Sequence, residues 1–572
     1  MNQEDTFEGK QRENASWQRA AAAKHARFDF SRAVRRTRIA KSCVKRARLE
    51  QNSHRHYPNR VTGRLKTLPW IEIGILALAA VLRIALLDIK PPHFDEGVNG
   101  WFADQMTRTG YFRYDPTNYH GPLHFYAVFL SQTLFGRNLW ALRLPAVVAS
   151  LLAVWSLLRF REHLGAPAAR LAALAMAVSP AYVFYGRYSI HESWMVLFSI
   201  LFLWGVMGLW EKGERRFLFA LITGASGMIL TKETYVLHIG CFLLASLMLW
   251  LWQKLLPSRP PLPLARQQWT WQDLGASGGI ALIAIVFFYS GTFLDFQALS
   301  GLYETFAAWF HTGVQAAGHE KSTYQIGPLN YYWLALMARY EWPALLGLGL
   351  CLRYIAPSDA RLRYLAIYGS GVLLAYSLIP YKTPWCIISI LWPFYLILGS
   401  TVLGQTKQSL KRLVRLLLRL VVAICIAVSA FLCLRLNFFR FTDGKEPYVY
   451  VQTFPEIETL TKPLLEMARK DPRYYYVRGQ ILLESYYPLP WMLGDFTQIG
   501  YYKKEEPPAA YDADVVVAEK DQAEKVESAL VGDYYKRTFR LRDSQEECVA
   551  YFRKGTFEEW FKGAPPLFQG KP

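Results

Sequence analysis

Long apolar runs recur along most of the chain, separated by short polar gaps. A helix of about 20 apolar residues crosses the hydrocarbon core of a bilayer. By this rule the pattern predicts about eleven transmembrane helices, at residues 68–88, 140–160, 171–188, 194–210, 217–230, 235–252, 274–293, 329–352, 365–379, 385–403 and 413–436. Residues 67–436 are therefore predicted to form an all-α, polytopic membrane domain.

Both ends of the chain lack such runs. Residues 1–66 are polar and rich in arginine, with no apolar stretch typical of a cleaved signal peptide, so they are predicted to form a basic cytoplasmic arm. Residues 437–572 have the composition of a soluble domain. Within them, strand patterns at 515–517 and 548–552 flank a helical pattern at 521–530, which predicts a small α/β domain. The aromatic segment 486–491 is expected in its core rather than against a glycan or the membrane.

The first connection, residues 90–138, is long enough to hold structure of its own. It contains a helical stretch near residues 98–109 and an apolar stretch at 122–135. The second stretch is too short to span a bilayer, so an interfacial or re-entrant helix is predicted.

The charge distribution sets the orientation. A net charge of +20 would suggest nucleic acid as the partner of a soluble protein. Here the basic residues gather in the N-terminal arm and in alternate gaps between apolar runs, which is the positive-inside pattern of a membrane protein. We therefore expect membrane lipid and no nucleic acid as a partner, a cytoplasmic N-terminus and, with an odd number of spans, an extracytoplasmic C-terminal domain. The seven cysteines are scattered without CxxC pairs, so neither structural zinc nor a disulfide framework is expected.

Ionisable residues near membrane depth are costly and usually serve a site. The first such group follows the first span and includes Asp95 and Glu96. Two adjacent carboxylates point in different directions, so one can act as a base or metal ligand while the other orients the loop. A solvated acid pair without function is the simpler alternative.

Basic residues in the later external loops are candidates for phosphate binding. His120 can bind phosphate or a metal ion. Arg187 suits bidentate contact with a lipid-linked phosphate, or it pairs with Glu192 and joins two helix ends. Together with Lys232, Lys321 and Lys382, Arg187 lies by topology on one side of the membrane, where phosphate would be attracted. No glycine-rich phosphate loop is present, which disfavours a nucleotide-dependent cytosolic enzyme.

The ordered motifs of the chain resemble a known family. These motifs are HFDEGVNGWFADQMTRTGYF, YHGPLHFYAVFLSQTLFG, ALRLPAVVASLL and YKTPW. They resemble the GT-C membrane glycosyltransferases, which include the dolichyl-phosphate-mannose protein mannosyltransferases and the lipid A aminoarabinose transferase, and most of all the flippase activity-associated proteins. The resemblance covers roughly residues 68–403. It implies a hexosyl or mannosyl type of transfer from a polyprenyl-phosphate donor, outside the cytoplasm and with inversion at the anomeric carbon.

The resemblance also implies roles for individual residues. Asp95 matches the acid that acts at the acceptor, Glu96 its neighbour, and Glu192 the acid of the second external loop. Lys321 and Lys382 match basic residues proposed to hold the donor phosphate.

The chain departs from the family at one motif. The transferase group often has Glu-Lys-Pro where this chain has His120-Gly121-Pro122. This leaves open whether His120 takes the place of the missing acid, and whether it does so on a divalent metal ion. No other cofactor is predicted.

Two further interpretations compete with the enzyme. One is a transporter or accessory protein for lipid-linked sugars, and the other is an inactive scaffold. A transporter usually carries ionisable groups at mid-membrane on broken, repeated helices, whereas here they cluster in external loops. The sequence therefore favours a transferase in the inner cell membrane that uses a glycan, lipid or protein as acceptor.

Overall fold

The computed structural model describes residues 70–118, 120–255, 265–315, 329–354, 359–404, 412–543 and 545–570. The chain divides into two compact units, residues 1–70 and 71–572. The features below belong to the second unit, and the predicted basic arm lies outside the described residues.

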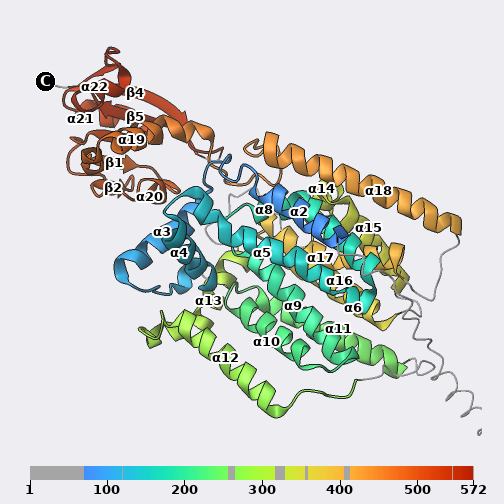
Figure 1. Cartoon of the computed structure of the whole chain (residues 1–572). Helices are drawn as coiled ribbons and strands as arrows, with labels where there is room; N and C mark the ends of the chain where they lie inside the picture. Colours follow the sequence, from blue (N-terminus) through green and yellow to red (C-terminus); the bar gives the residue numbers. More distant parts are fainter. Residues whose placement is uncertain are drawn as a thin grey trace, which may run out of the picture. The chain divides into compact units, whose positions relative to one another are not determined.

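Each of the eleven predicted spans coincides with one helix or with a pair of consecutive helices (Figure 1). These are α2 (Trp70–Ile84), α5 (Leu139–Arg159) with the short α6 (Arg161–Leu164), α7 (Ala166–Val178), α8 (Pro180–Gly186), α9 (Glu192–Glu211), α10 (Arg215–Ile229), α11 (Tyr235–Leu255), α12 (Trp271–Tyr289), α14 (Tyr332–Tyr340), α15 (Trp342–Cys351), α16 (Ala360–Leu378), α17 (Ile387–Leu403) and α18 (Arg412–Leu434). A further helix, α13 (Gly301–Trp309), follows α12.

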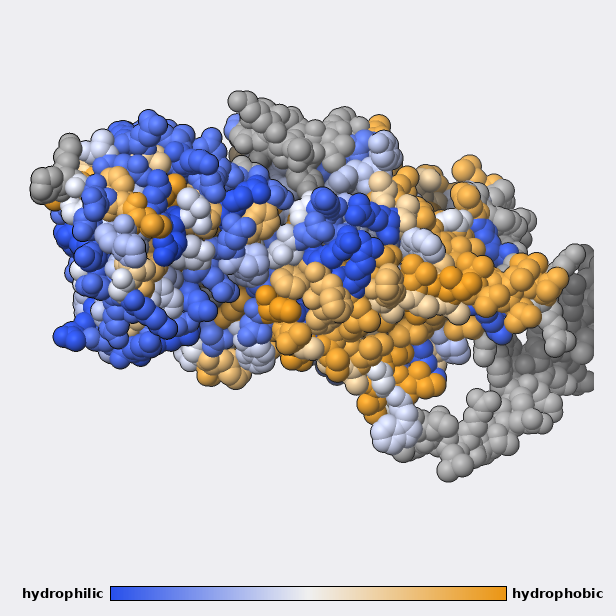
Figure 2. Space-filling view, turned by 90° about the horizontal axis from the view of Figure 1, so that it is seen from above, coloured by the Kyte–Doolittle hydropathy of each residue, from blue (hydrophilic) through white to orange (hydrophobic). Residues whose placement is uncertain are grey.

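Fewer of these helices are full-length apolar spans than the sequence pattern predicts. Among the described residues, six are long and apolar enough to cross a membrane, or seven if α7 and α8, bent by 60°, form one span. The other predicted spans include one that is short, α10, one that is broken between α14 and α15, and one that carries two arginines in its first turn, α16. The chain is an integral membrane protein, and Figure 2 shows a broad apolar surface over its helical part and a polar surface over the part that carries the sheet.

Helix α17 lies at the centre of the helical part and packs against α7, α15 and α16. Of its apolar window, 83% is buried within the protein. Small residues allow the backbones to approach closely. A Cβ on Gly399 would lie 2.2 Å from the carbonyl oxygen of Ala168, and one on Gly347 would lie 2.1 Å from that of Phe394. In contrast, only 6% of the apolar window of α12 is buried, so this helix lies at the periphery of the helical part.

The first loop contains two helices, α3 (Phe94–Thr109) and α4 (Leu123–Phe135). Helix α3 begins four residues earlier than predicted, inside the acidic motif. His93 is its N-cap: its Nδ1 accepts a hydrogen bond of 3.0 Å from the Asp95 N–H, and its own N–H donates to Glu96 Oε2 at 2.9 Å. This reciprocal capping satisfies two donors that a helix start leaves free. Both acids therefore lie in the first turn of α3.

The C-terminal part is a small α/β domain. Its six strands are β1 (Gly479–Leu482), β2 (Ile499–Tyr502), β3 (Val515–Glu519), β4 (Asp533–Arg540), β5 (Glu547–Arg553) and β6 (Phe568–Gln569), in the order β2-β1-β3-β5-β4-β6. Strand β1 runs parallel to β2 and β3, and the remaining pairs are antiparallel. The helices are α19 (Glu458–Lys470), α20 (Leu489–Met492), α21 (Ala523–Ala529) and α22 (Lys554–Phe561). Strands β3 and β5 match the predicted ones, whereas the other four strands were not predicted.

The C-terminal domain packs directly on α3. A Cβ on Gly97 would lie 2.4 Å from the Cα of Pro488, and one on Gly100 would lie 2.4 Å from Cδ1 of Trp491. The two glycines thus form a flat strip on α3 that admits the backbone and indole of the aromatic segment. Trp491 is buried in this contact, so the segment serves the joint between the two parts as well as the domain interior.

The glycine strip yields a test of this joint. Gly100→Ala is expected to lower the free energy of unfolding by about 1–3 kcal/mol, because the added methyl group collides with an indole that has no room to move. Limited proteolysis in the connection between α18 and α19 should also become faster. Gly240→Ala is the control, since a Cβ there meets nothing within 4 Å. Equal proteolysis of both variants would contradict the contact.

Candidate active site

Four segments that are far apart in the sequence meet around the start of α3. The His93 ring lies edge-on to the rings of Tyr188 and Trp385, with centroids 5.1 and 5.9 Å apart. Its Nε2 lies 2.7 Å from the carbonyl oxygen of Tyr450. The hydroxyl groups of Tyr450 and Tyr381 are 2.7 Å apart. The first loop, the turn before α9, the turn before α17 and the start of the C-terminal part therefore form one site.

Glu96 is enclosed in a polar cluster in which each of its carboxylate oxygens accepts two hydrogen bonds. Its side chain and that of Arg143 on α5 are both fully buried, with Arg143 Nε 2.8 Å from Glu96 Oε1 and Nη2 2.7 Å from Oε2. The backbone N–H groups of Ser189 and His93 donate the remaining hydrogen bonds, each at 2.9 Å. Burial by itself would raise the pKa of Glu96, but the charge and hydrogen bonds of Arg143 lower it to about 2. A carboxylate so enclosed holds the start of α3 to α5 and to the turn at Ser189.

Asp95 has the opposite environment. Its side chain is 37% exposed, whereas those of Glu96, Glu192 and Glu233 are 0%, 5% and 1% exposed. The nearest basic nitrogen paired with it is Nδ1 of His93, at 3.8 Å. Asp95 is thus the acid of this group that an incoming molecule can contact.

Arg187 is engaged with the end of α2. Its Nη1 donates to the carbonyl oxygens of Leu82 and Ala85 at 3.1 and 2.6 Å, and its Nη2 donates to that of Leu86 at 2.5 Å. A helix end leaves such carbonyl groups without partners, and a cation there also complements the helix dipole. Arg187 therefore caps α2 and is not paired with Glu192.

Glu192 and His120 each have a partner in the turn before α11. Glu192 forms a buried ion pair with Lys232, and His120 Nδ1 lies 3.1 Å from Glu233 Oε2. A backbone bridge also joins His120 to Lys232. These contacts bring three of the predicted external motifs together, but they occupy the groups that were expected to serve as an acid and as a phosphate ligand.

Three histidines lie in contact beside these pairs. The ring centroid of His191 lies 4.7 Å from those of both His120 and His124. His124 also accepts a hydrogen bond from the Trp194 indole N–H at 3.2 Å. Across the described ranges, no three His, Cys, Asp or Glu side chains are placed to hold a metal ion together.

Lys382 lies in the turn before α17, and its side chain is buried. Its ammonium donates to the carbonyl oxygen of Ile379. Burial lowers the pKa of Lys382 to about 8. The turn reaches the start of α3 through Trp385 and Tyr381, so Lys382 belongs to a segment that borders the site. Lys321 lies outside the described residues.

The structure adds three residues that sequence reasoning missed. Arg143 holds Glu96, as described above. Lys90 lies with its Nζ 3.1 Å from the ring centroid of Tyr188, and burial lowers its pKa well below the usual value. Arg542 of the C-terminal domain lies 5.1 Å from the Phe94 ring and donates to the carbonyl oxygens of Ser485 and Tyr487. Two of these residues had a signal in the sequence, because Arg143 lies at the start of a predicted apolar span and Lys90 lies just after the end of one. No local feature of the sequence marks Arg542.

Comparisons with known proteins agree with this architecture. A family model described as dolichyl-phosphate-mannose-protein mannosyltransferase matches residues 119–265. The structure is similar to ArnT from Cupriavidus metallidurans bound to undecaprenyl phosphate, with a TM-score of 0.55 and 17% identity over 85% of this chain and 98% of ArnT. The apo state of ArnT gives a TM-score of 0.54 and 16% identity, over 84% of this chain and 98% of ArnT. An oligosaccharyltransferase from Archaeoglobus fulgidus gives a TM-score of 0.48 and 12% sequence identity, over 83% of this chain and 74% of the oligosaccharyltransferase.

Comparison with curated protein sequences gave no match. The likeness to ArnT shows the fold, and with the family model it confirms the predicted resemblance to the GT-C superfamily. The membrane domain of this chain has the GT-C fold.

The burial of Glu96 generates a stability prediction. Glu96→Gln leaves Arg143 as an uncompensated buried charge, so the free energy of unfolding should fall by about 3–5 kcal/mol. Asp95→Asn, one residue away, should change it by less than about 0.5 kcal/mol because its side chain is partly exposed. Thermal unfolding of both variants in the same detergent measures the difference. Equal stability of the two would contradict the role of the pair.

The same pair sets a pH dependence of stability in the wild type. The pKa of Glu96 is about 2 in the folded protein and 4.5 ordinarily. The stabilisation is therefore complete above pH 4.5 and is lost as the pH falls from 4.5 towards 2.

Proposed function

We propose that this chain, a membrane protein of GT-C fold, is an inverting glycosyltransferase that moves a hexosyl or mannosyl-type sugar from a polyprenyl phosphate to an acceptor hydroxyl. The observation that carries the proposal is the contrast between the two adjacent acids at the start of α3. Glu96 is fixed by Arg143 and backbone N–H groups, which leaves Asp95 as the partly exposed acid at the start of α3, where the loops converge. That is the arrangement a general base requires.

The reaction can be written with these residues. The Asp95 carboxylate accepts the proton of an acceptor hydroxyl, and the acceptor oxygen attacks the anomeric carbon on the face opposite the phosphate. The bond between that carbon and the phosphate oxygen breaks, and its electron pair leaves with the polyprenyl phosphate. Attack from the opposite face inverts the anomeric centre, and no nucleotide is needed because the lipid phosphate is the leaving group.

The departing phosphate gains charge, which a nearby cation stabilises in a site sheltered from water. Lys382 supplies this cation, and Lys321 is proposed as a second. Glu96, Glu192, His120 and Arg187 act as positioning residues, because each is engaged with another part of the protein. ArnT, which has the same fold, binds undecaprenyl phosphate, and this supports a polyprenyl-phosphate donor here.

The proposed setting follows from the charge pattern. Residues 67–436 would lie in the inner membrane as the transferase domain, with residues 1–66 in the cytoplasm. The loop of residues 90–138 and the domain of residues 437–572 would then lie on the extracytoplasmic side, where the acceptor is a glycan, lipid or protein.

Asp95→Asn tests the proposal. The full-length protein in lipid is supplied with radiolabelled polyprenyl-phosphate sugars and native membrane extract, and release of free polyprenyl phosphate is measured. We expect transfer by the wild type and a loss of about 10²-fold or more in Asp95→Asn, the share that a general base usually contributes. Wild-type turnover by Asp95→Asn would remove the base assignment. Retained donor binding without release from any donor would instead favour a transport or accessory function.

The pKa of Lys382 gives a second test. Lys382 is protonated below its pKa of about 8 and neutral above it, so binding of polyprenyl phosphate should weaken as the pH rises through about 8. Arginine stays charged throughout this range. Lys382→Arg should therefore move the loss of binding to higher pH, and Lys382→Ala should bind weakly at every pH. A titration of fluorescent polyprenyl phosphate from pH 6.5 to about 9.5 measures this. An unchanged profile in Lys382→Ala would contradict the phosphate contact.

A further inference from the structure

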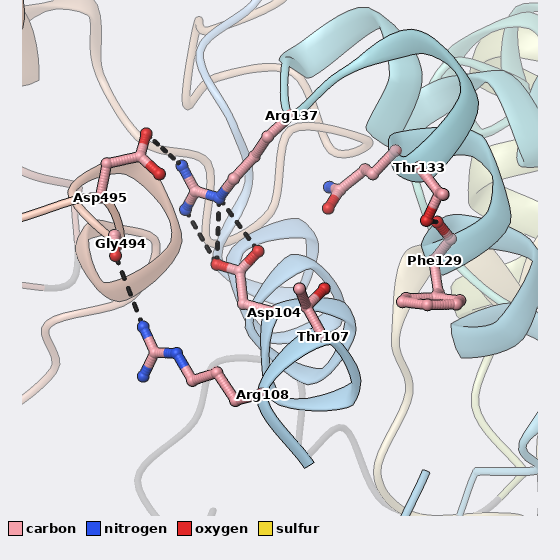
Figure 3. A pocket seen from close by; sticks show the side chains of 9 residues that line it. Asp104, Thr107, Arg108, Phe129, Thr133, Arg137, Gly494 and Asp495 are labelled. Carbon is pink, nitrogen blue, oxygen red and sulfur yellow. Dashed lines mark hydrogen bonds and ion pairs between the residues drawn. The ribbon is translucent and has the colours of Figure 1, made fainter. Parts of the chain in front are cut away.

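A cavity of about 430 Å³ lies where α3, α4 and the C-terminal domain meet (Figure 3). This volume falls within the range of small-molecule sites, which is about 300–1,000 Å³. Asp104 lies nine residues after Asp95 on the same helix, which is about 13 Å along the helix axis. The cavity is thus separate from the reaction site. Its lining residues are Asp104, Thr107, Arg108, Phe129, Gln132, Thr133, Arg137, Gly494 and Asp495.

The lining carries two cations and two anions, so its formal charge is zero. Arg137 lies between Asp104 and Asp495, at 2.9 and 3.3 Å, and also donates to the carbonyl oxygen of Trp491. Arg108 is exposed and makes one long hydrogen bond, of 3.5 Å, to the carbonyl oxygen of Gly494. A balanced lining of this kind does not favour a strongly anionic ligand such as a phosphate.

The cavity offers both donors and acceptors. Within the described part of the chain, Nε2 of Gln132 is buried and has no hydrogen-bond partner. A buried donor without a partner is costly, and rotation of the Gln132 amide into the cavity that this residue lines would let a ligand supply the missing acceptor. The hydroxyl groups of Thr107 and Thr133 donate to the carbonyl oxygens of Ala103 and Phe129, at 3.3 and 2.8 Å, and so keep lone pairs for a ligand.

Two further groups complete the lining. The Asp495 side chain is 54% exposed and remains an acceptor, and Phe129 adds an aromatic surface. Each sugar hydroxyl both donates and accepts, and the C–H faces of a sugar ring suit an aromatic surface. We infer that this cavity binds a neutral saccharide unit, namely a part of the acceptor that lies remote from the reacting hydroxyl. That the saccharide belongs to the acceptor rests on the proposed function. That the cavity binds a saccharide does not.

Saccharide binding can be measured without any transfer reaction. Saturation-transfer NMR on the full-length protein in nanodiscs would use the methyl glycosides of mannose, glucose, galactose and N-acetylglucosamine, with mannose 6-phosphate as the charged counterpart. We expect at least one neutral glycoside to bind, and Gln132→Leu to weaken its binding by about tenfold, the effect of losing one good hydrogen bond. The matched control is Gln105→Leu, because Gln105 lies on α3 but does not line the cavity.

Three results would overturn the saccharide site. These are no binding of any neutral glycoside by the wild type, equal weakening in Gln132→Leu and Gln105→Leu, and tighter binding of mannose 6-phosphate than of every neutral glycoside.

A kinetic experiment tests the link to the acceptor. In the transfer assay, Gln132→Leu should raise the KM for acceptor by about tenfold and leave kcat and the KM for donor unchanged. Glycoside binding by a wild type that transfers no sugar would mean that the proposed function fails and the site stands. Transfer with an unchanged acceptor KM in Gln132→Leu would mean that the cavity is not part of the acceptor path.

Discussion

The buried ion pair between Arg143 and Glu96 is the interaction on which the site depends. Besides Glu96, the Arg143 guanidinium donates to the carbonyl oxygens of Leu87 and Pro91, at 2.7 and 3.2 Å. One side chain on α5 therefore holds the chain that leaves α2, while Glu96 holds the start of α3 and the turn at Ser189. Removing two charges from water costs several kcal/mol per ion, and only the full set of hydrogen bonds offsets it. The pair is consequently better understood as a fixed point for the loop than as a source of net stability.

The same pair explains how two neighbouring acids of similar chemistry acquire different roles. On the first turn of a helix, consecutive side chains point about 100° apart, so Glu96 faces α5 while Asp95 points to another side of the helix. One environment supplies a full set of donors, and the other leaves the carboxylate partly in water. Differences of environment of this kind commonly separate acid, base and structural roles in enzymes.

The sequence predicted the helical architecture well because a bilayer imposes a length and an apolar composition on whatever crosses it. It overestimated the number of uninterrupted spans, because windows of apolar residues run across real breaks such as that at Glu341 between α14 and α15. The convergence of the external motifs was also predictable, since alternation of charge assigns them to one side.

The partners within the site were not predictable in the same way. Lys232 was expected near a phosphate but pairs with Glu192, and Arg187 caps α2 instead of meeting Glu192. Which cation meets which anion depends on contacts between residues 40 to more than 100 positions apart, which no local pattern records. The four missed strands are short, and their register depends on the sheet as a whole.

The contact of the C-terminal domain with α3 has a consequence for the timing of synthesis. His93 and its partner Tyr450 are separated by 357 residues, and Trp491 lies further still along the chain. At the usual rate of translation, roughly 20–70 seconds pass between the synthesis of the first loop and that of the C-terminal domain that packs on it. Throughout that interval the glycine strip on α3 has nothing to pack against. The site at the start of α3 is therefore completed among the last events of biogenesis, and a chain cut short before the C-terminal domain would be inserted in the membrane without a finished site.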